Sequence, residues 1–389
     1  MTTHVFIVGS TTFKIHLEYL FVGTGAMDNI VDFNDKSTSS LHSTKENMLV
    51  SMISDASRIR KGDLIIFYLQ QSFSDKIFDG KFYGIFKAKN DWSFLDNNSK
   101  NQYLKRNLGK SLTFRTLVEP YKVYAEGVTE WEALDEIKNI TSPNQMLWSL
   151  IYRKLKGNRG NTMVTIYESE RLCQLIRNKN NKIELNCGNN LLSFDANSQK
   201  IVCLENLPNK YSGEKEKLNI LTRLVGKFKE EKSFESHLQA YIVKILSMGV
   251  DKNLDKIILD GGDIEWLGNE VSCGVGMQRI DIMPSVIKNN QKIVLPIELK
   301  SVEASEKNII QIQRYIDWIE QYYIPNRQSD IQPVLISMRI NNKNSESYKK
   351  IIDGFKKFNE LNKSRCNKLK FIEFSIKDNG LIFEEIKYV

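Results

Sequence analysis

Residues 279–300 place three charged side chains within apolar segments, in the sequence RIDIMPSVIKNNQKIVLPIELK. Asp281 has an isoleucine on each side, and Glu298 and Lys300 flank a leucine. Short apolar segments bounded by polar turns are typical of strands in a protein interior. Burying a charge there costs several kcal/mol unless it is paired or binds a metal ion. The fold must therefore make these three charges tolerable, and this requirement constrains what the chain can form.

We predict that a hairpin with the polar turn SVIKNNQK brings Asp281 beside Glu298. Alternate side chains of a strand share a face, so Glu298 and Lys300 lie on one face of their strand. Two carboxylates and a lysine suit a Mg²⁺ site that retains several waters, and we expect Mn²⁺ to substitute. Pro296 cannot donate to a sheet ladder, so the strand is irregular or at an edge there. The alternative is a hairpin residue at Asp281 and an exposed Glu298–Lys300 ion pair, worth under about 1 kcal/mol.

The segment that follows Lys300, SEKNIIQIQRYIDWIEQYY, is predicted to form a long helix. Its isoleucines recur at helical spacing, which is typical of core packing. Gln311 and Tyr315 are four residues apart on a neighbouring face of this helix. Glu235 lies on an earlier predicted helix and could turn toward the same site.

These elements resemble the motifs of PD-(D/E)xK nucleases that carry a Q-x-x-x-Y helix. Residues 230–345 are similar to the C-terminal nuclease domain of the mismatch-specific endonuclease group. The resemblance implies that a divalent metal ion is bound by two carboxylates and that a lysine assists hydrolysis. It implies that Asp281 and Glu298 are the metal ligands and that Lys300 is the catalytic lysine. Gln311 and Tyr315 would be supporting residues. Glu235 is carried over as well, from a helix in which family members differ.

The first part of the chain contains predicted strands at KGDLIIFYLQ and KFYGIFKAK, after an opening strand at HVFIV. These segments, with EGVTEWEAL, resemble the EVE/YTH-like branch of the PUA superfamily. The resemblance implies a β-barrel domain with helices that binds nucleic acid and often holds a modified base in an aromatic cage. Tyr68, Tyr83, Trp92, Trp131 and Trp148 are the available aromatic residues. Tyr68 and Tyr83 lie in strands, where core packing is the alternative, whereas Trp92 lies in a polar loop.

A basic segment, YRKLKGNRGN, contains a glycine-bearing loop suited to phosphate contacts that position DNA without specifying sequence. A solvated surface loop is the alternative. The candidate DNA-binding residues are therefore Trp92, Tyr68, Tyr83, Arg153, Lys154, Lys156 and Arg159.

Composition changes along the chain predict two domains and a connector. Residues 1–178 form the expected PUA-like recognition domain, and residues 179–232, rich in Asn, Lys and Ser, form a connector. In residues 233–389 predicted strands and helices alternate, which indicates an α/β layer with a mixed sheet. The predicted fold class is thus α/β and α+β, with a restriction-endonuclease-like second domain.

The net charge of +8 favours an anionic partner such as nucleic acid. Five cysteines without paired spacing fit a reducing cytoplasm and argue against a zinc ribbon or a disulfide scaffold. The first residues lack the pattern of a signal peptide, and no apolar run approaches 18 residues, so we expect no membrane span.

The sequence therefore predicts a cytoplasmic, Mg²⁺-dependent restriction-type endonuclease that cuts double-stranded DNA. One active site cuts one strand, so double-strand cleavage predicts a homodimer on DNA. A companion methyltransferase would be a partner of such an enzyme. Two alternatives stay open, a mismatch or repair endonuclease and a non-catalytic nucleic-acid reader.

Overall fold

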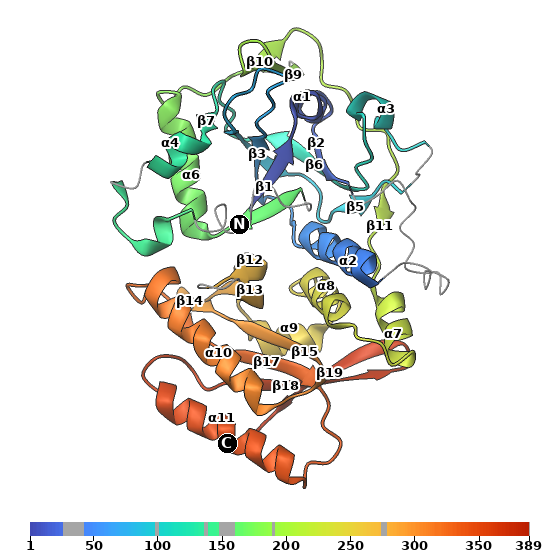
Figure 1. Cartoon of the computed structure of the whole chain (residues 1–389), viewed down its shortest axis with the longest axis vertical. Coiled ribbons are helices and arrows are strands. Elements are labelled where there is room, and N and C mark those ends of the chain that lie inside the picture. Colours follow the sequence, from blue (N-terminus) through green and yellow to red (C-terminus); the bar gives the residue numbers. More distant parts are fainter. Residues whose placement is uncertain are drawn as a thin grey trace. The chain divides into compact units, whose positions relative to one another are not determined.

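The computed structural model describes residues 1–25, 43–97, 101–135, 139–147, 160–188, 191–273 and 278–388. The chain divides into two compact units (Figure 1). The first unit comprises Met1–Val31 and Asp55–Leu218, and the second comprises Asp32–Ser54 and Asn219–Val389. None of the described helices is long and apolar enough to cross a membrane.

A mixed sheet with surrounding helices forms the first unit. Its described elements are β1 (Thr3–Val8), α1 (Ser10–Tyr19), β2 (Phe21–Thr24), β3 (Leu64–Leu69), β4 (Lys81–Ala88), β5 (Phe94–Leu95), α3 (Lys105–Leu108), β6 (Phe114–Pro120), β7 (Val128–Thr129), α4 (Glu130–Asp135), the 3₁₀ turn η3 (Pro143–Gln145), β8 (Asn161–Val164), α6 (Ile166–Lys179), β9 (Leu191–Asp195), β10 (Lys200–Leu204) and β11 (Glu216–Lys217). The strand order is β11-β5-β6-β4-β3-β1-β8, with β2 on β6 and β7 on β4. β1 runs parallel to β3 and antiparallel to β8.

The segment predicted to be a connector is divided between the two units. β9 and β10 form a hairpin in the first unit, where the centroids of the Phe194 ring and the Phe13 ring of α1 are 4.9 Å apart. This packing buries Phe194 in the same apolar core as the strands, so the hairpin belongs to that core. The division between the units therefore falls after Leu218.

A disulfide joins Cys187 to Cys203, although the scattered cysteine spacing predicted no such pair. The two residues are 16 positions apart, with Cα atoms 5.4 Å apart. Cys203 lies on β10, and the fold of the β9–β10 region brings Cys187 against it. Sequence spacing alone could not predict this contact, because the intervening hairpin determines it.

The second unit is built on another mixed sheet. Its described elements are α7 (Leu221–Lys229), α8 (Glu235–Ile245), α9 (Lys252–Leu259), β12 (Asp263–Ser272), β13 (Arg279–Lys288), β14 (Gln291–Val294), β15 (Ile297–Glu303), α10 (Glu306–Trp318), the π-helix η4 (Ile319–Tyr323), β16 (Asp330–Ile331), β17 (Val334–Met338), α11 (Glu346–Asn362), β18 (Lys370–Lys377) and β19 (Gly380–Ile386). The strand order is β16-β14-β13-β15-β17-β18-β19, with β12 on β13. β15, β17 and β18 are parallel neighbours, and β18 and β19 are antiparallel. The mixed-sheet α/β fold class expected from the sequence is confirmed.

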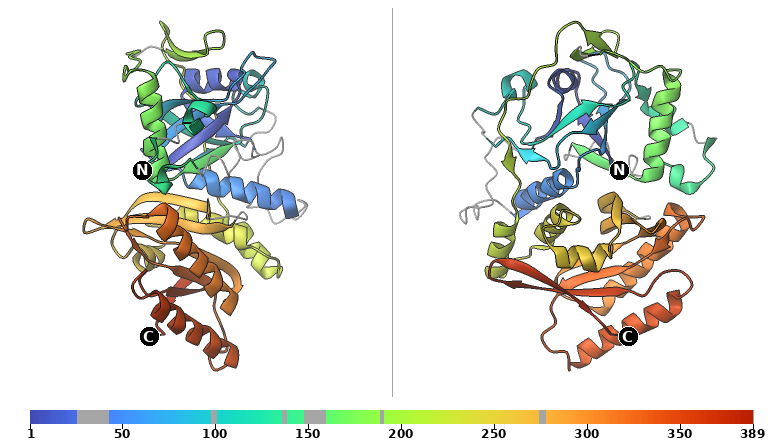
Figure 2. Two further views of the ribbon diagram at one scale, coloured as in Figure 1. Left: turned by 60° about the vertical axis from the view of Figure 1, so that its left-hand side comes forward. Right: turned by 180° about the vertical axis from the view of Figure 1, so that it is seen from behind.

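Helices cover both faces of this second sheet (Figure 2). α8 and α9 share one apolar core with residues such as Ile297, Leu299 and Ile336. α11 packs on the opposite face, where the Phe355 ring lies 5.1 Å from the Phe371 ring. Because side chains alternate along β15, Glu298 lies on the face opposite the Ile297 and Leu299 side chains.

The helix α2 (Ser43–Ser57) supplies a buried carboxylate to the second unit. Glu46 accepts hydrogen bonds from Arg223 Nε (2.7 Å) and Lys227 Nζ (2.9 Å) of α7. His237 Nε2 of α8 lies 2.9 Å from Glu46 Oε1. All four side chains are buried, so this cluster fixes residues 43–54 to α7 and α8. The unit is therefore completed by a helix that lies far from it in the sequence.

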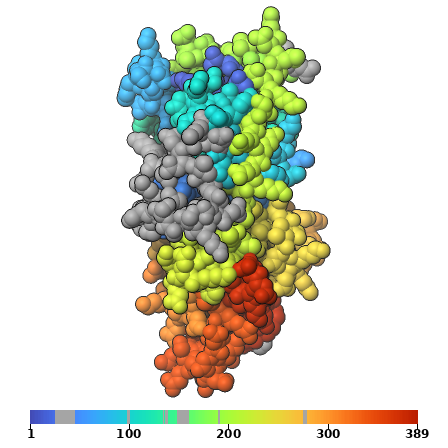
Figure 3. Space-filling model, turned by 90° about the vertical axis from the view of Figure 1, so that its right-hand side faces the viewer, coloured from blue at the N-terminus to red at the C-terminus, as the bar shows by residue number. Residues whose placement is uncertain are grey.

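α7 also adjoins the turn between β18 and β19 (Figure 3). Lys229 Nζ donates to Asn379 Oδ1 at 2.8 Å. A hollow of about 480 Å³ beside this contact is lined by Leu221, Val225 and Gly226, among others. It contains none of the charged residues that the sequence singled out.

Candidate active site

β13 and β15 separate from each other at the position of the predicted site. A single residue pair, Ile282 with Ile297, joins the two strands. β14 ends at Val294 and β15 begins at Ile297, so the strand is interrupted around Pro296, as its missing N–H predicted. The pairing of β15 with β17 is also irregular between Leu299 and Glu303. Main-chain groups in this gap therefore need partners other than a regular ladder.

The predicted carboxylates and lysine come together at this gap. The hairpin itself joins β13 to β14, and β15 then continues beside β13, which brings Asp281 opposite Glu298. Asp281 Oδ2 accepts a hydrogen bond from the Leu299 N–H at 2.8 Å. Lys300 Nζ lies 2.7 Å from Glu298 Oε1, whose side chain is 0% exposed. The exposed ion pair considered as an alternative is excluded by this burial of Glu298.

α10 contributes Tyr315 to the site. The Tyr315 hydroxyl donates to Glu298 Oε2 at 2.6 Å and lies 2.9 Å from the main-chain oxygen of Arg279. Gln311, one turn earlier, is half-buried, and its side chain makes no hydrogen bond with another described residue. Of the two residues of the Gln-x-x-x-Tyr element, Tyr315 therefore contacts a candidate carboxylate, that of Glu298, directly.

α8 contributes two side chains from one of its faces. Glu235 Oε1 lies 3.5 Å from Lys300 Nζ, and Glu235 Oε2 accepts the Ser301 N–H at 3.4 Å. Gln239 follows Glu235 by four residues and donates from Nε2 to the main-chain oxygen of Asp281 at 2.8 Å. The sequence interpretation missed Gln239, although its four-residue spacing from Glu235 places both on one helix face.

Burial and mutual repulsion disfavour ionisation of both carboxyl groups. Burial, followed by the charge of Glu298, raises the pKa of Asp281 well above its ordinary value. Burial also raises the pKa of Glu298, although Lys300 and the Tyr315 hydroxyl favour its charged form. Burial alone would lower the pKa of Lys300, but Glu298 and its neighbouring carboxylates outweigh burial and raise it. Lys300 is therefore favoured in its charged form, and ionising both carboxyl groups would leave more negative charge than one ammonium offsets.

This donor set fits a hard divalent cation. Two neighbouring carboxylates whose pKa values are raised by burial, and at Asp281 also by the charge of Glu298, gain from an added positive charge. Within the described residues, no group of three or more His, Cys, Asp or Glu side chains is arranged to hold a metal. If Asp281 and Glu298 held a cation, water molecules would supply its other ligands, because Mg²⁺ in proteins usually retains several waters.

Asp281→Asn is expected to stabilise the metal-free protein, because it removes the cost of ionising a buried carboxyl group beside Glu298. The folded-state pKa of Asp281 is raised, so ionising it costs stability as the pH rises above the unfolded value of 3.8. The gain should be present at pH 7 and vanish below pH 3.8, where the carboxyl is protonated in both states. Urea unfolding with EDTA at both pH values measures this difference. A loss of stability at pH 7 would contradict the assigned repulsion.

The predicted aromatic residues of the first unit differ in their exposure to solvent. Tyr83 is 0% exposed and packs in the apolar core of the first unit. Its hydroxyl donates to the main-chain oxygen of Gln199 at 2.7 Å. Tyr68 is also buried and donates to Glu130 Oε2 at 2.9 Å. This arrangement favours the core-packing alternative for both rings. Trp92 is 36% exposed, with Lys217 Nζ 5.6 Å from its ring centroid, so its ring is accessible to a ligand.

The predicted phosphate-contacting residues lie outside the described residues. These are Arg153, Lys154, Lys156 and Arg159, and Trp148 lies outside them as well. Trp131 is described, is 61% exposed and donates from Nε1 to Asp79 Oδ1 at 3.2 Å.

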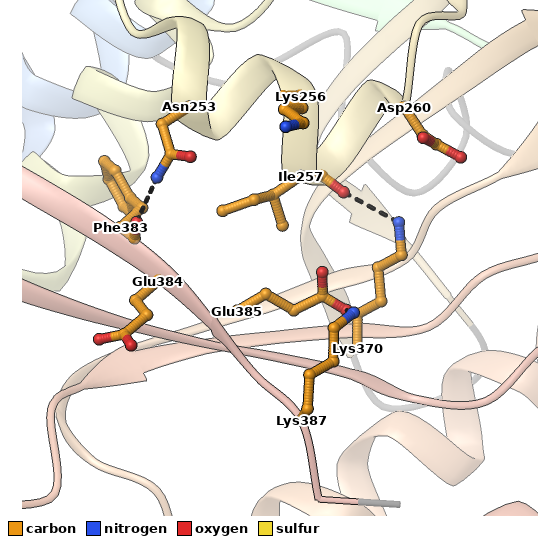
Figure 4. Close-up of a pocket in the computed structure, with 9 residues that line it drawn as sticks. All are labelled: Asn253, Lys256, Ile257, Asp260, Lys370, Phe383, Glu384, Glu385 and Lys387. Atoms are coloured by element: carbon orange, nitrogen blue, oxygen red, sulfur yellow. Dashed lines mark hydrogen bonds and ion pairs between the residues drawn. The ribbon is translucent and has the colours of Figure 1, made fainter.

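A separate pocket of about 510 Å³ lies between α9 and the β18–β19 hairpin (Figure 4). Lys370 of β18 donates to the main-chain oxygen of Ile257, in the last turn of α9, at 2.9 Å. Asn253 donates to the Phe383 oxygen from the same helix. Burial lowers the pKa of Lys370. None of the candidate active-site residues lines this pocket, and Lys370 is used there to cap the carbonyl end of a helix.

No protein-family model matches the sequence, and no curated protein sequence is similar to it. Among solved structures, the chain is similar to Pyrococcus furiosus SfsA in complex with Ca²⁺, with 15% identity, a TM-score of 0.25 and coverage of 39% of this chain and 63% of that chain. It is also similar to human THYN1 in complex with DNA that contains 5-methylcytosine, with 7% identity, a TM-score of 0.26 and coverage of 45% of this chain and 97% of that chain. These similarities assign no family to the chain.

Proposed function

We propose that the chain is a Mg²⁺-dependent DNA endonuclease of the restriction type, in which the second unit hydrolyses the phosphodiester bond. One observation supports this proposal above the others. Asp281, Glu298 and Lys300 meet in the gap between β13 and β15, and Tyr315 and Glu235 contact the same three charges. A buried pair of carboxylates beside a protonated lysine suits a reaction in which negative charge develops on phosphorus-bound oxygens.

Each side chain has a part in this chemistry. The Lys300 ammonium would stabilise the charge that develops when water attacks phosphorus and the bond to the leaving oxygen breaks. Asp281 and Glu298 would hold the metal ion, which when bound offsets their charge and lowers the pKa of a water molecule. The Tyr315 hydroxyl, which donates to Glu298, fixes the orientation of that carboxylate.

The first unit would select the cleavage site. Trp92, with its accessible ring and neighbouring Lys217, is suited to stack on a base. Recognition could use a modified base or an unmodified sequence, and both fit the same nuclease site. Because the described residues contain one candidate active site, cleavage of both strands would need two chains on the DNA.

Digestion of methylated and unmethylated genomic DNA tests the proposal, with Mg²⁺, with Mn²⁺ and with EDTA, followed by sequencing of the ends. We expect cleavage that depends on the metal, with ends at one recurrent sequence or modified base. Cleavage of mismatched duplexes alone would instead support a repair endonuclease. DNA that is bound but stays intact under all conditions would overturn the nuclease proposal and support a nucleic-acid reader.

A further inference from the structure

Side chains on one face of α8 hydrogen-bond the main chains of both strands beside the gap between β13 and β15. Beyond the pair of Ile282 and Ile297, no regular ladder joins these strands. Glu235 of α8 accepts the Ser301 N–H from β15, and Gln239 of α8 donates to the Asp281 oxygen of β13. The two α8 residues are four positions apart, so one face of a single helix contacts both strands.

Gln239 is buried, and its side chain contacts the main chain of Asp281. Its side chain is 6% exposed, and its donor lies 2.8 Å from the Asp281 oxygen. The Asp281 carboxylate is fixed at the same time by the Leu299 N–H. The main-chain oxygen of Asp281 thus accepts a hydrogen bond from Gln239 of α8, and its carboxylate accepts one from the Leu299 N–H of β15.

We propose that Gln239 is a positioning residue, which sets the main chain of Asp281 so that its carboxylate lies opposite Glu298. Without this donor the Asp281 carbonyl loses a hydrogen bond at the gap, and β13 can shift toward or away from β15. A displacement of Asp281 changes the spacing of two charges that must share one cation, and partners of metal ligands typically contribute about 10–100-fold in metal affinity. This role rests on the proposed function, because it concerns the metal ligands of that same site.

Metal affinity measured without DNA tests this role. Gln239→Met keeps the length of the side chain and removes the donor, and Gln239→Asn keeps its polarity and shortens its reach. We expect both variants to bind Mn²⁺ about tenfold more weakly than the parent chain in isothermal titration calorimetry. Raising the metal concentration should restore cleavage in both variants, because the defect lies in affinity.

Gln332→Met is the matched control in the same unit. Gln332 Nε2 donates to the main-chain oxygens of Pro333 (3.1 Å) and Lys368 (2.7 Å), so this variant loses bonds of the same kind away from the site. It should bind Mn²⁺ as the parent does, whatever its thermal unfolding temperature. Parent-like Mn²⁺ affinity in folded Gln239→Met and Gln239→Asn, or an equal loss in Gln332→Met, would overturn the role of Gln239 alone. A parent chain that neither binds Mn²⁺ nor cuts DNA would remove the proposed function, and this role with it.

Discussion

Lys300→Ala is expected to slow DNA cleavage by about 10²–10³-fold, the usual cost of removing one group that stabilises developing charge. Lys300 contacts the buried Glu298 at 2.7 Å and Glu235 at 3.5 Å. The surrounding carboxylates outweigh burial and raise its pKa, so the role we propose for Lys300 is to supply a positive charge. DNA binding should persist, because most of the affinity for DNA comes from contacts with many phosphates. Single-turnover cleavage in Mg²⁺ and fluorescence anisotropy without metal measure the two effects.

Lys292→Ala provides the control for the removal of a lysine. Lys292 lies on β14 of the same sheet and pairs with Glu265 at 2.8 Å, and its side chain is 44% exposed. This variant should cut DNA at the parent rate. Thermal unfolding of Lys300→Ala must be measured as well, since Glu298 loses its ion pair. If folded Lys300→Ala cuts as fast as the parent, Lys300 has no part in the reaction.

Glu46→Ala is expected to destabilise the second unit by about 3–5 kcal/mol, the cost of leaving a buried charge without its partner. Arg223 and Lys227 are both buried, and Glu46 accepts hydrogen bonds from each. His237 of α8 also loses its contact with the carboxylate. Hydrogen–deuterium exchange of α7 and α8 should therefore accelerate strongly, and the urea midpoint of this unit should fall.

Glu46 should also make the stability of the second unit depend on pH. Burial opposes its ionisation, but hydrogen bonds from His237, Arg223 and Lys227 outweigh burial and lower its pKa. The stabilisation is thus complete above the unfolded value of 4.5 and declines as the pH falls below it. The stability difference between the parent and Glu46→Gln should shrink in that range. Glu385→Ala, which breaks the exposed pair with Lys387, is the control and should cost under about 1 kcal/mol.

Local patterns in the sequence predicted much of the second unit. The apolar residues around Asp281 and Glu298 indicated strands, and the polar turn between them indicated a hairpin. Alternation along a strand then put Glu298 and Lys300 on one face, as the structure has them. The isoleucine periodicity predicted the helix that carries Gln311 and Tyr315, and the structure places Tyr315 beside Glu298. Each inference used residues close together in the chain, where backbone geometry dictates the spacing of side chains.

Contacts between distant segments were not predictable in this way. Glu46 meets Arg223 across 177 residues, and no periodicity relates the two positions. The β9–β10 hairpin looked like a connector because its surroundings are polar, yet Phe194 reaches the core of the first unit. Strand residues such as Tyr83 have the same local pattern whether they face a core or a ligand, so burial had to come from the fold.

The path of the chain between the two units limits how they could be exchanged in evolution. The chain passes from one unit to the other after residues 31, 54 and 218. Recombination at a single junction near residue 218 would give the second unit a foreign first part without Glu46. Arg223 and Lys227 would then be buried without their carboxylate. A new first unit could be acquired only together with a helix that supplies this carboxylate, so the two parts are expected to be inherited as one gene.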